Sequence, residues 1–167
     1  MPDSTAPDQS ASVDPKRSPL HAVHEAAGAT FTDFGGWLMP VRYASDLAEH
    51  RAVREAAGLF DISHMAELAV SGPQAAAFLD YALAANVSAL QVSKAKYTMI
   101  LQPDGGVIDD LIVYRNSPGE FLVVANAGNR DAVVSELRER IQGFDPALHD
   151  GTEAISLTAV QGPVAER

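Results

Sequence analysis

The sequence of 167 residues contains no cysteine. That absence excludes a disulfide framework, a thiol nucleophile and a metal site built on thiolates. Long apolar runs are also missing, because no stretch approaches the roughly 20 residues that a membrane-spanning helix needs. A chain of this kind is compatible with the reducing cytoplasm, so we expect a cytoplasmic protein with no membrane partner.

Positive charge is scarce as well. Lys and Arg together number 12 against 22 Asp and Glu, which gives a formal net charge of −10. Binding to a phosphate backbone needs clustered Lys and Arg, so we expect no nucleic-acid partner. Apolar residues, in contrast, make up 47% of the chain. That is enough for the core of one ordinary domain, or of one domain with pieces of another.

Several common catalytic motifs do not occur. The sequence has no glycine-rich phosphate loop followed by Lys-Ser or Lys-Thr, and no His-Glu-x-x-His zinc helix. Residues 61–65 contain Asp, Ser and His, but such close neighbours rarely converge into a hydrolytic triad. A turn held by Asp and Ser side chains is the favoured interpretation. His21 and His24 lack a nearby third ligand, so we expect solvent-facing histidines and no bound metal.

Residues 1–17 differ in composition from the rest of the chain. They are rich in Ser, Asp, Pro and Ala and contain no apolar stretch. Such a segment cannot bury enough apolar surface to offset the entropy of ordering, and it lacks the hydrophobic region of a signal peptide. We therefore expect a disordered tail over residues 1–17.

From residue 18 onward the sequence predicts helices and strands. Capping residues and glycines favour helices over residues 18–28 and 45–58, and another helix begins after Pro73. Apolar spacing indicates a helix over residues 129–142, whereas residues 31–43 are interpreted as irregular. Strands are predicted over residues 66–70, 96–102, 107–114, 121–125 and 153–160. That order indicates an α+β fold with helices flanking a mainly antiparallel sheet.

Two adjacent carboxylates lie inside one of these apolar strands. Asp109 and Asp110 follow a turn over residues 103–106, and the surrounding Val, Ile and Leu residues indicate a buried strand. Strand side chains alternate, so Asp110 shares a face with Tyr114 while Asp109 points to the other face. Both faces are mainly apolar, and a buried carboxylate is costly unless it is paired or hydrogen-bonded. We therefore expect this pair to mark a functional site or a specific polar network.

Aromatic residues supply a weaker signal. Trp37 with Met39, and Tyr97 with Tyr114, could form part of an aromatic pocket. Taken alone, each pair is better explained as core than as the wall of a ligand site. Composition and spacing therefore predict a globular α+β chain with one unusual carboxylate.

Five segments of the chain occur in the same order in a known family. They are residues 18–21, 34–43, 58–65, 104–114 and 161–163. Together they resemble the aminomethyltransferase family of the glycine cleavage system, the T-protein. The third and fourth segments, residues 58–65 and 104–114, are the ones most specific to this family. The resemblance covers nearly everything after Arg17, but only about the first half of the family's length.

The resemblance implies an activity and a set of site residues. Members of the family take the aminomethyl group carried on the lipoyl arm of the H-protein and pass its carbon to tetrahydrofolate, releasing ammonia. The partners implied are therefore the lipoylated H-protein and tetrahydrofolate as co-substrate, with no metal. The family's key aspartate maps onto Asp110, whose implied role is to hold and polarise the pterin. By the same mapping the folate pocket is lined by Met65, Tyr97, Asp110, Tyr114 and Asn126.

The resemblance also implies a division of the chain. Residues 18–57 form a segment that packs, in the family, against the C-terminal half. Residues 58–152 form an α+β folate-binding subdomain, and residues 153–167 begin a returning domain that is cut short. The sequence stops four residues after Pro163, which opens a helical turn. We therefore expect an N-terminal fragment with little activity of its own.

Two further hypotheses stay open. The chain could be a non-catalytic folate-binding regulatory relative, or a one-carbon-transfer domain of a sarcosine or dimethylglycine oxidase. Asp110 favours the enzyme, because a regulatory relative need not keep the acid. The short start argues against the oxidase, which would need a flavin domain upstream. The chain also departs from the family at Ala66, where a glycine is usual; the added methyl group is tolerated if φ is negative there.

Overall fold

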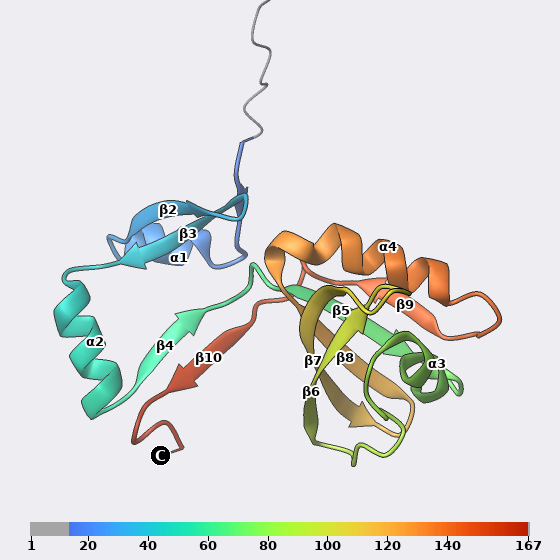
Figure 1. Cartoon of the computed structure of the whole chain (residues 1–167). Coiled ribbons are helices and arrows are strands. Elements are labelled where there is room, and N and C mark those ends of the chain that lie inside the picture. The colour runs from blue at the N-terminus through green and yellow to red at the C-terminus, as the bar shows by residue number, and fades with distance from the viewer. Residues whose placement is uncertain (1–13, 167) are drawn as a thin grey trace, which may run out of the picture.

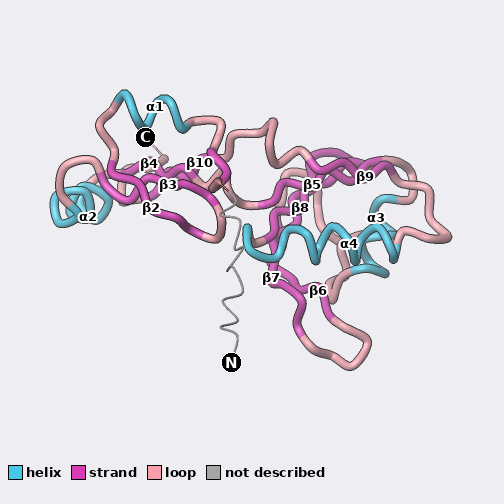
Figure 2. The backbone as a smooth tube through the Cα atoms, turned by 90° about the horizontal axis from the view of Figure 1, so that it is seen from above, coloured by secondary structure: helices cyan, strands magenta, loops and turns pink. Residues whose placement is uncertain are grey.

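A computed structural model describes residues 14–166, which form two lobes (Figure 1). Seen from above, the N-terminal elements and a larger lobe lie at opposite ends of the molecule, and the chain passes twice between them (Figure 2). Residues 1–13 of the predicted tail lie outside the described residues. None of the helices within residues 14–166 combines the length and the apolar character needed to cross a membrane.

The larger lobe contains a five-stranded antiparallel sheet. Its strands lie in the order β6-β7-β8-β5-β9. Their bounds are β5 Ala66–Ser71, β6 Ala95–Leu101, β7 Val107–Ser117, β8 Glu120–Ala125 and β9 Ala147–Asp150. The predicted hairpin is confirmed, because β6 and β7 are paired around the turn after Leu101. The α+β class with a mainly antiparallel sheet is confirmed as well.

Two helices cover one face of this sheet. They are α3 (Ala75–Ala82) and α4 (Arg130–Arg140), the latter preceded by the short 3₁₀ helix η1 (Ala127–Asn129). The core between helices and sheet is apolar, as the alternation along the strands predicts. Its largest fully buried members include Leu68, Phe78, Leu79, Ile100, Leu111, Phe121 and Leu137. The opposite face of the sheet is therefore the one left for a site.

The N-terminal lobe contains a hairpin that the sequence did not predict. Strands β2 (Thr30–Phe34) and β3 (Trp37–Arg42) are antiparallel, so the interpretation of residues 31–43 as irregular is wrong. The turn between them needs positive φ at Gly35 (60°) and Gly36 (82°), which glycine adopts without strain. Strand β1 (Lys16–Arg17) pairs with β3, so these two residues are a strand rather than part of a disordered tail.

The helices of this lobe follow the capping rules in part. Helix α2 (Asp46–Glu55) begins after Ser45, whose hydroxyl accepts a hydrogen bond from the Ala48 amide, as predicted. Helix α1 (His21–Ala26) begins later than predicted. The Ser18 hydroxyl accepts from the Leu20 amide at 3.2 Å and donates to Asp61 at 2.6 Å, so Ser18 holds the turn that precedes the helix rather than the first helical residue.

A two-stranded ribbon occupies the region between the lobes. Strand β4 (Gly58–Asp61) pairs with β10 (Thr158–Gln161) in antiparallel register. The predicted single strand over residues 153–160 is therefore wrong in extent. Its first half is a turn, and β9 forms earlier in the chain, at the edge of the large sheet. The error arises because β9 pairs with β5 and β10 pairs with β4, and pairing between strands so far apart in the sequence leaves no local pattern.

The core of the larger lobe yields a stability prediction. Leu137 on α4 is fully buried, so Leu137→Ala should lower the free energy of unfolding by about 2–5 kcal/mol, through lost transfer energy and a cavity. The neighbouring Arg138 is exposed. Arg138→Ala should change the free energy of unfolding by only about 0.5 kcal/mol. Urea unfolding followed by circular dichroism measures both, and equal losses would contradict the assigned core.

Candidate functional site

The predicted site residues of β6 and β7 share the helix-free face of the sheet. Asp110 pairs with Met99, and Tyr97 pairs with Ile112. Directly paired residues in antiparallel strands have side chains on the same face, and alternation along β7 adds Tyr114. Both tyrosines are accessible, at 64% for Tyr97 and 40% for Tyr114. The result is an exposed aromatic face that carries the Asp110 carboxylate.

The carboxylate of Asp110 is fixed by two donors. The Tyr97 hydroxyl donates to Asp110 Oδ2, and the side-chain amide of Asn126 donates to Asp110 Oδ1 at 3.1 Å. The same amide also donates to the Asp110 carbonyl oxygen at 3.0 Å. The hydrogen bond to Asp110 raises the pKa of Tyr97, and partial burial and the charges of both aspartates raise it further. Tyr97 therefore stays a hydrogen-bond donor at neutral pH.

Asp109 is separated from its neighbour as the alternation predicts. Only 2% of Asp109 is exposed, and it lies on the core side of β7. Its carboxylate accepts from the Asn126 backbone amide at 2.9 Å, from the Asn126 side chain at 2.9 Å and from the Asn129 side chain at 2.6 Å. These donors replace the water that burial removes. Asn126 thus contacts both acids and sets their relative position.

Met65 lies at the edge of the same face, and the next residue, Ala66, points into the core. The ladder between β5 and β8 ends at the pair Ala66–Ala125, so Met65 and Asn126 are each the next residue beyond it. Ala66 is fully buried and is not among the residues with positive φ. The methyl group that replaces the usual glycine therefore sits in an ordinary conformation. The structure brings Met65, Asn126, Asp110, Tyr97 and Tyr114 to one face, while their roles stay predictions.

Glu67 is a buried acid that the sequence reasoning missed. It is fully buried, and its carboxyl oxygens have no hydrogen-bond partner within residues 14–166. It pairs with Val124, which pairs with Ile112, so it lies on the site face in the same row as Tyr97. Burial, with smaller rises from the charges of Asp150 and Asp61 and an opposing effect of Arg130, raises the pKa of Glu67 to about 7. Glu67 alternates with the core residues Ala66 and Leu68, so the strand pattern places it on the outer face and gives no signal of its burial.

The segment after β9 covers Glu67. The Gly151 amide donates to the Glu67 carbonyl at 2.9 Å, and the Glu67 amide donates to the Thr152 hydroxyl at 3.1 Å. A Cβ atom at Gly151 would stand 2.7 Å from Ile155 Cδ1, so the end of the Ile155 side chain packs against this glycine.

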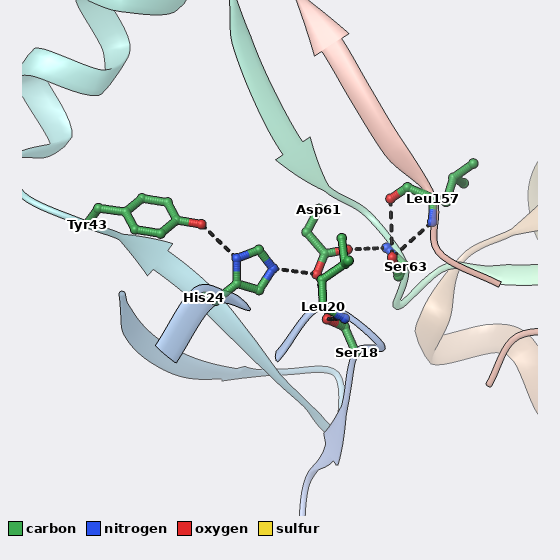
Figure 3. A network of polar contacts seen from close by, with 7 residues as sticks. All are labelled: Ser18, Leu20, His24, Tyr43, Asp61, Ser63 and Leu157. Carbon is green, nitrogen blue, oxygen red and sulfur yellow. Dashed lines mark hydrogen bonds and ion pairs between the residues drawn. The ribbon is translucent and has the colours of Figure 1, made fainter. Parts of the chain in front are cut away.

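A second polar cluster lies where the lobes meet (Figure 3). Asp61 at the end of β4 accepts from the Ser18 hydroxyl at 2.6 Å, from His24 Nε2 at 2.8 Å and from the Ser63 amide at 2.9 Å. The Tyr43 hydroxyl lies 2.7 Å from His24 Nδ1. Burial would raise the pKa of Asp61, but the hydrogen bonds from Ser18, Ser63 and His24 hold it below its ordinary value.

This cluster corrects one prediction and confirms another. His21 and His24 are both buried, so the expectation of solvent-facing histidines is wrong. The turn at residues 61–65 is confirmed, since Asp61 accepts from the Ser63 amide, although the Ser63 hydroxyl bonds the backbone of the distant Leu157 rather than the turn itself. Within residues 14–166, no group of three His, Cys, Asp or Glu side chains is arranged to hold a metal ion.

Comparison with known proteins adds the family. A family model described as the GCVT N-terminal domain matches residues 20–167. The chain is 58% identical over 151 residues to an aminomethyltransferase of Saccharopolyspora erythraea, covering 90% of this chain and 41% of that protein. An aminomethyltransferase of Corynebacterium jeikeium is also 58% identical, over 150 residues, with 90% and 39% covered. The chain therefore spans about two fifths of the length of these curated relatives.

Two solved structures share the fold of the chain. Glycine cleavage system aminomethyltransferase T from Bartonella henselae superposes with a TM-score of 0.81 at 43% identity, covering 90% of this chain and 41% of that one. The heterotetrameric sarcosine oxidase from Corynebacterium sp. U-96 superposes with a TM-score of 0.51 at 15% identity, covering 89% of this chain and 62% of that one. The second likeness shows a shared fold alone.

The raised pKa of Glu67 predicts a pH-dependent stability. The ordinary glutamate value is 4.5, and the folded value is about 7. Between these values the folded state keeps a proton that the unfolded state loses, so raising the pH should lower the free energy of unfolding, by about 3 kcal/mol in all. Below the ordinary value and above the folded value this contribution should be flat.

Urea unfolding at several pH values between about 5 and 8 measures the slope. Glu67→Gln keeps the shape of the side chain and should remove this part of the slope. Glu120 lies exposed at the start of β8, so Glu120→Gln is the matched control and should keep the wild-type slope. A wild-type slope in Glu67→Gln would show that Glu67 is not the titrating group.

Proposed function

We propose that this chain, which belongs to the GCVT N-terminal domain family, forms the folate-facing part of an aminomethyltransferase of the glycine cleavage system. Support comes from relatives that carry the name aminomethyltransferase and match 90% of the chain. In the proposed reaction, two bonds of the aminomethyl carbon break: the bond to the lipoyl sulfur of the H-protein and the bond to the amine nitrogen. The carbon forms bonds to two nitrogens of tetrahydrofolate, so the products are ammonia, reduced H-protein and methylenetetrahydrofolate.

The observation that carries the proposal is the carboxylate of Asp110 on an exposed aromatic face. Tyr97 and Asn126 fix this carboxylate in place, and Tyr114 lies on the same face. A pterin is a flat heteroaromatic ring with neighbouring N–H donors, which suits both stacking on an aromatic side chain and a carboxylate that can accept two hydrogen bonds. We infer that Asp110 holds and polarises the pterin so that a folate nitrogen attacks the aminomethyl carbon, and that it can accept the proton released there.

Asp109 has a different role in this proposal. Its carboxylate is saturated by Asn126 and Asn129 and lies on the core side of the strand. It can therefore act on the substrate only through Asn126, whose side-chain amide also reaches Asp110. We infer that Asp109 is a positioning residue, whereas Asn126 and Met65 border the pterin.

The N-terminal lobe is proposed to contact polypeptide beyond these residues, as residues 18–57 do in the family. Apolar side chains are exposed within residues 18–57, including Phe34, Val41 and Leu47, and on the adjoining ribbon at Leu59 and Val160. The fifteen-percent likeness to sarcosine oxidase does not favour the oxidase hypothesis, because it shows the fold alone. No contact within residues 14–166 favours the regulatory hypothesis over the enzyme.

The two aspartates should respond differently to substitution. In a polypeptide that carries this chain at the relatives' full length, Asp110→Asn should lower the transfer rate to tetrahydrofolate by about 100-fold or more, since the negative acceptor is lost. Asp109→Asn should cost less activity and more stability, because it changes a buried acceptor of three hydrogen bonds. Ammonia release in the presence of aminomethylated H-protein measures the rate. The reverse ranking would overturn the assignment.

The isolated chain should bind folate weakly. Ligand sites usually bury about 70–90% of a ligand's surface, whereas Tyr97 and Tyr114 present one open wall. Calorimetry with residues 1–167 should therefore show no saturable heat at micromolar tetrahydrofolate, and the chain should turn over no substrate. Micromolar affinity would show that this wall is sufficient by itself.

A further inference from the structure

Asp61 is the point at which the N-terminal lobe is hydrogen-bonded to the segment that enters the site. Its side chain is 1% exposed and belongs to the last residue of β4. Two of its donors, Ser18 and His24, come from the N-terminal lobe and are 43 and 37 residues away in sequence. An ionised carboxylate only accepts hydrogen bonds, so His24 donates from Nε2 and leaves Nδ1 to accept from Tyr43 in the neutral ring.

The four residues after Asp61 form a tightly bonded turn. Asp61 Oδ1 accepts from the Ser63 amide, and the Met65 amide donates to the Ile62 carbonyl at 3.0 Å. The Ser63 hydroxyl donates to the Leu157 carbonyl at 3.3 Å and accepts from the Leu157 amide at 2.9 Å. Figure 3 shows Ser63 between Asp61 and Leu157. The turn is therefore held on both sides and has little freedom to move alone.

That turn ends in the site. Met65 immediately precedes β5 and lies at the edge of the face that carries Asn126 and Asp110. A further contact ties the same turn to the N-terminal hairpin, because the rings of Phe34 and His64 meet edge to face at 5.4 Å between centroids. A displacement of Asp61 would therefore be passed to Met65 through only three intervening residues.

We propose that His24 and Ser18 are positioning residues of the site: by donating to Asp61 they fix the turn at residues 61–65 and thereby the place of Met65 beside Asn126. That Met65 borders a ligand rests on the proposed function. The structural coupling of Ser18 and His24 to Met65 through Asp61 does not. A merely structural role would stabilise the N-terminal lobe and leave the surroundings of Met65 unchanged while that lobe stays folded.

Methionine methyl resonances test the coupling in the chain itself. Met39 lies buried in the N-terminal hairpin, Met65 ends the turn, and Met99 faces Asp110 from β6. In protein labelled at the methionine methyl groups, His24→Leu should move the Met65 resonance and leave Met99 in place. His24→Gln should restore the wild-type position, because its amide can still donate to Asp61.

Two further variants keep the test decisive. His50→Leu on the exposed surface of α2 is the matched control and should move none of the three resonances. If His24→Leu unfolds the N-terminal lobe, seen as loss of the folded Met39 resonance, Ser18→Ala takes its place, because it removes one hydroxyl and no ring. An unmoved Met65 resonance in the folded variant would overturn the proposal.

A kinetic readout connects the coupling to the site. In the polypeptide of the relatives' full length, Ser18→Ala should raise the KM for tetrahydrofolate several-fold and change kcat little, because Met65 borders the ligand and takes no part in bond making. An unchanged KM would refute the positioning role. If the wild-type protein showed no transfer at all, the proposed function would fail, while the Met65 resonance would still decide the coupling.

Discussion

The structure depends on the register of β7 between its two neighbours. Side chains alternate along a strand, so a slip of one residue would bury Asp110 and expose Asp109. The Asn126 side chain opposes that slip, because its amide donates to Asp109 at 2.9 Å on one face and to Asp110 at 3.1 Å on the other. One amide group therefore fixes which acid is buried and which one faces the open surface. The aromatic face around Asp110 has its composition only in this register, since Tyr97 and Tyr114 are placed by the same pairing.

Three acids are buried within residues 14–166, and they differ in the hydrogen-bond donors that surround them. Asp109 is supplied with donors from Asn126 and Asn129, and Asp61 with donors from three residues, so both can be buried as charged groups. Glu67 has no such donors within residues 14–166, and its pKa rises to about 7, so burial favours its neutral form instead. The arrangement at Asp61 stabilises the fold at neutral pH, because its hydrogen bonds hold the pKa below the ordinary value. Ionisation of Glu67 destabilises the fold instead, because its charged form lacks donors. Hydrogen-bond supply rather than depth therefore separates Asp61 from Glu67.

Local patterns explain which parts of the fold could be predicted. The hairpin of β6 and β7, the cap of α2 and the separation of the two aspartates all follow from alternation and capping within a few residues. The buried state of His24 could not be found in this way, because its partner Asp61 is 37 residues away. Likewise, Ser63 is hydrogen-bonded to Leu157, which is 94 residues away. The β2–β3 hairpin was not predicted because its segment contains two glycines and a proline, which usually indicate irregular structure. Those contacts depend on tertiary packing, which leaves no period in the sequence.

The same distinction divides the candidate site. Tyr97 and Asp110 lie on the paired strands β6 and β7, and Asn126 directly follows β8, so the short connections of the sheet are enough to bring them together. Met65 is different, because the turn that carries it is bonded to Ser18, His24 and Leu157 through Asp61 and Ser63. Loop-closure entropy makes such distant contacts form late and open early, since many residues must be ordered before they contribute. The acid and aromatic part of the face is therefore intrinsic to the larger lobe, whereas the place of its Met65 edge depends, in our proposal, on the hydrogen bonds that Ser18 and His24 donate to Asp61.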